Sequence, residues 1–88
     1  MTSPAKSRPR QALDLLHQGG LKPGPEWERA HSLCQMAEGD RDHDLVHALC
    51  HWIEGDMANR NLWYARLAPW VPAASLDLEW HAVAATLP

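Results

Sequence analysis

The chain has 88 residues, of which 45% are hydrophobic and 22% charged, and its formal net charge is −3. This composition is typical of one globular domain and excludes a disordered chain, and the negative charge argues against nucleic acid as a partner. No apolar run is long enough to cross a bilayer and no secretory signal follows Met1, so we expect a cytoplasmic protein without membrane association.

The first half of the chain contains the start and stop signals of two helices. Ser7 is a suitable N-cap for the first helix, and the glycine pair at 19–20 ends it. Pro25 occupies the favoured first position of the second helix. Gly39 is the residue at which we expect this second helix to end.

The second half contains the signals of three more helices. Asp40 or Asp42 caps the third, which Gly55 ends. The fourth is predicted over residues 57–67, and Ser75 caps the fifth. No segment shows the sustained alternation of a strand.

Two stretches of the chain are nearly the same. Residues 30–40 and 46–56 share His, Leu, Cys, Glu, Gly and Asp at equivalent positions. Helix capping and an apolar stripe explain most of this repetition. The paired Cys34 and Cys50 fall within the apolar stripes, where cysteine acts as a small hydrophobic residue. We expect reduced, buried thiols, with a disulfide between them as the less favoured alternative.

These signals predict an all-α fold. We expect a compact bundle of four to five short helices around a central antiparallel helical hairpin that resembles a tetratricopeptide unit. The domain is predicted to cover residues 7–88, with a disordered tail at residues 1–6. Because so small a bundle has a limited core, a homodimer that buries a tryptophan-rich face is a further expectation.

Helix capping does not explain the histidines. His47, His51 and Glu54 lie on one side of the third predicted helix, together with His43. His31 is the equivalent of His47 in the second helix, so it can approach the pair if the two helices are neighbours. Two histidines four residues apart can bind one metal ion, and a third histidine and a carboxylate complete a tetrahedral set. This hypothesis predicts zinc or iron bound by His31, His47, His51 and Glu54.

Other interpretations of the same residues stay open. Half-buried histidines can have a structural role through hydrogen bonds. A hydrolytic or proton-transfer enzyme is another alternative, but the sequence has neither a nucleophile motif nor a phosphate loop, so we assign no catalytic residue. The favoured hypothesis is a non-catalytic binding module for a protein or small-molecule partner. Its candidate polar site contains His31, His47, His51, Glu54, Asp56, Asn59 and Tyr64.

Two linked motifs resemble a known group of sequences. They are W-x-x-A-H-x-x-x-Q, which begins at Trp27, and H-A-x-x-H-x-x-E-G-D-x-x-N-x-x-x-W-Y-x-R, which begins at His47. Together with the ending Leu-Glu-Trp at residues 78–80, they resemble small, all-helical bacterial proteins of unknown function. The resemblance implies a shared fold and a shared constellation of His, Glu, Asp and Asn side chains. It implies no reaction.

Overall fold

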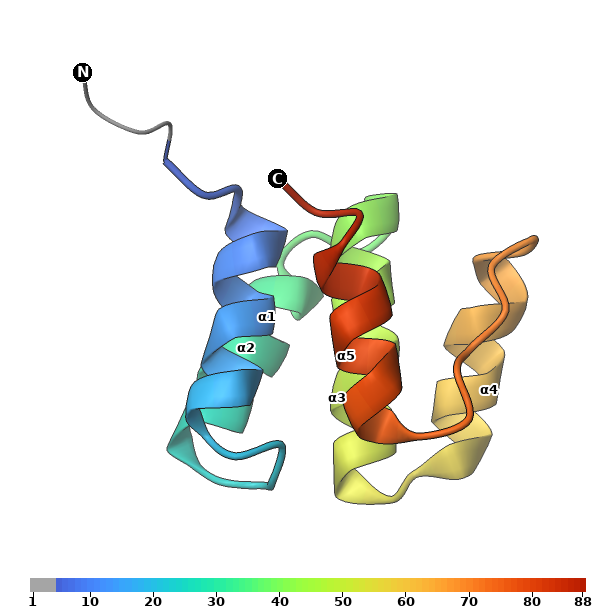
Figure 1. Ribbon diagram of the computed structural model, residues 1–88, viewed down its shortest axis with the longest axis horizontal. Helices are drawn as coiled ribbons and strands as arrows, with labels where there is room; N and C mark the ends of the chain where they lie inside the picture. Colours follow the sequence, from blue (N-terminus) through green and yellow to red (C-terminus); the bar gives the residue numbers. More distant parts are fainter. Residues whose placement is uncertain (1–4) are drawn as a thin grey trace.

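A computed structural model describes residues 5–88 of the protein (Figure 1). These residues form helices and no strand, which confirms the predicted all-α fold. The disordered tail was predicted for residues 1–6, of which residues 1–4 lie outside the described residues. In the described part of the chain, no helix combines the length and the apolar character needed to cross a membrane. The helices are α1 (Arg8–Gln18), α2 (Pro25–Gln35), α3 (Arg41–Glu54), α4 (Met57–Arg66) and α5 (Leu76–Ala84).

Helix α3 is the centre of the bundle. It packs against each of the other four helices, and every residue from 43 to 51 is buried. In Figure 1, α1 and α2 lie on one side of α3 and α4 lies on the other, while α5 covers its front. A helix that is enclosed on all sides requires its polar residues to be buried as well. This is why the histidines of α3 lie inside the protein.

The predicted capping residues occupy the helix starts. In each case a side-chain oxygen accepts a hydrogen bond from the backbone N–H three residues further on, which satisfies a donor that the helix itself leaves unpaired. Gly55 ends α3 with a φ of +81°, the left-handed conformation that glycine adopts without strain. The capping residues are Ser7, Asp40, Asp56 and Ser75.

Helix α2 is shorter than predicted. We expected it to end at Gly39, but it ends at Gln35 and is followed by a turn. Met36 is 83% exposed, so a longer helix would gain little from burial at this point. The N–H of Gly39 instead donates to the carboxylate of Asp44, at 3.2 Å, which holds the turn against the start of α3.

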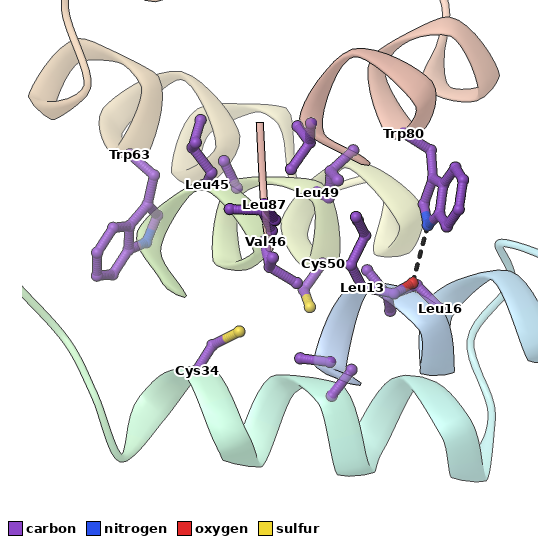
Figure 2. Close-up of a cluster of buried hydrophobic side chains, with 14 of the residues drawn as sticks. Leu13, Leu16, Cys34, Leu45, Val46, Leu49, Cys50, Trp63, Trp80 and Leu87 are labelled. Carbon is purple, nitrogen blue, oxygen red and sulfur yellow. Dashed lines mark hydrogen bonds between the residues drawn. The ribbon is translucent and has the colours of Figure 1, made fainter. Parts of the chain in front are cut away.

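The hydrophobic core contains residues of all five helices (Figure 2). The indole N–H of Trp80 in α5 donates to the carbonyl of Leu13 in α1, at 2.8 Å. Cys34 and Cys50 are both free and buried, as expected, and their sulfur atoms point toward one another between α2 and α3. The neighbouring Cys34 thiol and burial raise the pKa of Cys50, so this thiol stays protonated.

Candidate metal centre

Three histidine rings meet at the contact between α2 and α3. The ring centroid of His47 lies 4.8 Å from that of His31 and 4.8 Å from that of His51, and His31 and His51 are 5.6 Å apart. One nitrogen from each ring lies within 4.8 Å of the other two. The four-residue spacing places His47 and His51 on one face of α3. The packing of α2 on α3 brings His31 to the pair.

Two tryptophans enclose the histidines. The ring of Trp27 stacks on His31 at a centroid distance of 4.8 Å, and the ring of Trp63 stacks on His47 at 4.2 Å. Trp27 is fixed in place because its indole N–H donates to the carbonyl of Cys50, at 2.8 Å. The guanidinium of Arg66 covers Trp63 at 5.1 Å. One face of His31 and one face of His47 are therefore covered by tryptophan rings.

Two of the histidine nitrogens are buried without a partner. Within residues 5–88, His31 Nε2 and His47 Nδ1 are the buried side-chain polar atoms that make no hydrogen bond. A buried polar atom left unpaired costs about 1–3 kcal/mol of stability. Two such atoms in one cluster indicate a site shaped for a ligand that accepts electron pairs or donates hydrogen bonds.

The site favours neutral imidazole rings. Burial, together with the neighbouring His31 and His51 rings, lowers the pKa of His47 to about 4. Burial and the nearby His51 also lower the pKa of His31. A neutral imidazole keeps a lone pair that a metal ion can use, so these rings are in the ligating form at neutral pH.

Glu54 supports the cluster in a way that differs from the predicted ligation. Its Oε1 atom lies 2.7 Å from Nδ1 of His51, close enough for that nitrogen to donate a hydrogen bond. A carboxylate in this position fixes the orientation of a metal-binding histidine and leaves its Nε2 atom free to bind. In this structure, Glu54 therefore positions His51.

Asp56 and Asn59 lie at the edge of the cluster. A carboxylate oxygen of Asp56 belongs to a second group of close ligand atoms with His51 and Glu54. Asp56 also caps α4, and Asn59 donates to it from both its backbone N–H, at 3.2 Å, and its side-chain amide, at 2.7 Å. These hydrogen bonds lower the pKa of Asp56 and keep its carboxylate at the α3–α4 turn.

Tyr64 is the candidate residue that the structure places in a different network. Its hydroxyl donates to the carboxylate of Glu79 in α5, at 2.7 Å. Burial and this hydrogen bond raise the pKa of Tyr64. The indole N–H of Trp70 and the backbone N–H of Ala73 donate to the same carboxylate, at 2.8 and 2.9 Å. Glu79 thus joins α5 to α4 through Tyr64 and to the following loop through Trp70 and Ala73.

The role of Glu79 was not predicted from the sequence. This residue is fully buried in α5, between positions that the apolar pattern assigns to the core. An acidic residue within an apolar stripe was the available signal, because a buried carboxylate needs hydrogen-bond donors. The donors themselves come from α4 and the following loop, and the sequence alone does not show that these segments reach α5.

Comparisons with protein-family models, with curated proteins and with solved structures find no match to this chain. The resemblance to small bacterial proteins therefore stays a prediction. The interpretation of the site depends on its own geometry and electrostatics.

Proposed function

We propose that this protein is a small, non-catalytic binding protein and that its ligand is a divalent transition-metal ion, zinc or iron, held by His31, His47 and His51. One observation carries the proposal: three ring nitrogens lie within 4.8 Å of one another. Two buried histidine nitrogens of this cluster have no hydrogen-bond partner within residues 5–88. A metal ion bound by these rings offsets the cost of burying them.

The chemistry of the donor set favours these metals. Imidazole nitrogen suits zinc, iron, copper and nickel, and the hydrogen bond from His51 to Glu54 supplies the outer carboxylate common at such sites. Zinc–nitrogen bonds of about 2.0–2.1 Å in a tetrahedral arrangement place the nitrogens about 3.3 Å apart. The rings therefore move together on binding, from separations of up to 4.8 Å.

Metal binding should connect two helices. His31 belongs to α2, whereas His47 and His51 belong to α3. A metal ion bound by all three joins the helices at the point where Cys34 and Cys50 already pack. Because the ligands are assembled only in the folded chain, binding adds to the free energy of unfolding, by about 2.7 kcal/mol when the free metal exceeds Kd by a factor of 100.

The test combines metal content with thermal stability. We expect the purified, tag-free protein to bind one equivalent of zinc or iron, and we expect a chelator to lower its Tm by several degrees. His31→Ala and His47→Ala should each abolish both effects. His81→Ala is the matched control, since His81 is an exposed histidine of α5 outside the cluster.

Two results would contradict the proposal. One is a protein that binds neither zinc nor iron and has the same Tm with and without the chelator. The other is metal binding that survives both His31→Ala and His47→Ala. The first result would favour the histidines as contacts for a protein partner, which a pull-down with wild type and His47→Ala would then test.

A further inference from the structure

We infer that the metal centre has one coordination position that the protein leaves open, and that this position takes a small monovalent anion. The inference depends on the proposed function and deepens it. It follows from the number of protein ligands, from the charge of the site and from the side on which the cluster reaches solvent.

The protein supplies three ligands to this cluster. In the described part of the chain, the group of close donor atoms around His31 and His47 contains His51 and no carboxylate or thiol. Glu54, the nearest predicted ligand, is hydrogen-bonded to the outer nitrogen of His51. Zinc is four-coordinate, and sites with three protein ligands keep the fourth position for water or another small molecule.

The flanking side chains do not provide the fourth ligand. Trp27 and Trp63 stack on the faces of His31 and His47, and an indole ring offers no lone pair to a metal ion. The same rings limit the space beside the histidines, so a small ligand of two or three atoms fits this position better than a large one.

The charge of the site favours an anion. Three neutral imidazoles leave the full double charge of the metal ion in a site with aromatic walls, where an uncompensated charge is costly. The carboxylates of Glu54 and Glu38 act electrostatically on His31, and that of Asp56 lies near His51 and Glu54. Because none of the three belongs to the group of ligand atoms formed by the histidines, they compensate only part of that charge. A monovalent anion therefore suits the remainder better than a phosphate dianion.

The anion can reach the metal from the side of His31. His47 and His51 are buried, whereas His31 is partly exposed at the surface of α2. Glu54, next to His51, is also in contact with solvent. His31 Nε2 itself is buried, so the edge of the cluster between His31 and Glu54 is the side nearest to solvent, from which we expect a small ion to approach.

The test uses the cobalt-loaded protein with sodium azide as the probe. Tetrahedral cobalt(II) absorbs visible light, and these bands change when a ligand of the metal changes. We expect one equivalent of cobalt, and a saturable shift of its visible bands as azide is added at constant ionic strength. Sodium perchlorate at the same concentration should leave the bands unchanged, and so should azide added to the His47→Ala variant with cobalt in solution.

The Glu54→Gln variant identifies the fourth ligand. If the position is open in the native protein, azide should shift the bands of both proteins, and the affinity of Glu54→Gln should be several-fold higher because a nearby negative charge is lost. If azide shifts the bands of Glu54→Gln alone, Glu54 is itself the fourth ligand and the inference is wrong.

The remaining outcomes separate the inference from the proposed function. Stoichiometric cobalt without any response to azide, in either protein, would overturn the open position and leave the metal site standing. Failure to bind cobalt, zinc or iron would overturn the proposed function and the inference together.

Discussion

Two buried polar groups lie in neighbouring parts of this bundle, and they differ in how their hydrogen bonds are satisfied. Glu79, at the contact of α5 with α4 and the loop that follows, accepts three hydrogen bonds of 2.7–2.9 Å. His31 and His47, at the contact of α2 with α3, each keep a buried nitrogen that has no partner within residues 5–88. The same 84-residue stretch of described chain therefore contains one complete polar network and one incomplete network.

We interpret this difference as one between a structural network and the proposed binding site. A carboxylate with three donors contributes to the fold, because its burial is compensated by the protein alone. An incomplete network has a cost that the protein does not offset by itself, and such costs concentrate at sites that bind ligands. We therefore expect that removing Glu79 lowers the free energy of unfolding, whereas removing the His47 ring raises it in the metal-free protein.

The largest effect is expected at Glu79. Glu79→Ala leaves three donors unpaired, the buried hydroxyl of Tyr64 and the partly buried N–H groups of Trp70 and Ala73, and should lower the free energy of unfolding by about 3 kcal/mol. Urea denaturation measures this loss. Glu79→Gln, which keeps one acceptor oxygen, provides a milder variant if Glu79→Ala does not fold. Unchanged stability in both variants would contradict a structural role for this network.

A smaller effect is expected from pH in the metal-free protein. The pKa of His47 falls from 6.5 in the unfolded chain to about 4 in the fold, because burial beside His31 and His51 disfavours the charged ring. Between these values the unfolded chain binds more protons, so stability rises with pH. Above pH 6.5 the ring is neutral in both states and its titration costs nothing, whereas a fall in pH toward 4 should lower the free energy of unfolding by about 2–3 kcal/mol through this group.

Denaturation curves recorded from pH 4 to pH 7 with a chelator present measure this dependence. The His47→Leu variant is the control, and its stability should vary less over the same interval. A wild-type curve as flat as that of the variant would show that the His47 ring is not held in its neutral form by the fold.

The smallest expected effect is a gain in the free energy of unfolding, whereas the two effects above are losses. In the metal-free protein, His47→Leu replaces an unpaired buried nitrogen with an apolar side chain and should raise the free energy of unfolding by about 1 kcal/mol. His43→Leu is the matched control on the same helix. His43 is also buried, but its Nδ1 atom lies 2.6 Å from Asp40, so its removal should lower stability by about 0.5–1 kcal/mol.

Both variants are compared by urea denaturation with a chelator present. A loss of stability in His47→Leu equal to that in His43→Leu would mean that the two histidines have the same structural role. The contrast between a complete and an incomplete network would then not apply to the cluster.

Local signals in the sequence determined where the helices begin and which two histidines of the candidate site form a pair. Ser7, Asp40 and Ser75 cap the helices they were predicted to cap, because a capping hydrogen bond joins residues only three apart. The pairing of His47 with His51 follows in the same way from the repeat of one helix. These features depend on neighbouring residues, and a single sequence contains all of that information.

The rest depends on which helices touch. The sequence predicted that His31 can approach His47 only if α2 and α3 are neighbours, and it assigned Glu54 to the metal without showing its hydrogen bond to His51. It placed Tyr64 among the histidines, whereas the position of α5 directs its hydroxyl to Glu79. Periodicity reports which side of a helix is apolar, but not which helix covers it. Only the tertiary packing decided which of the described polar groups find hydrogen-bond partners and which do not.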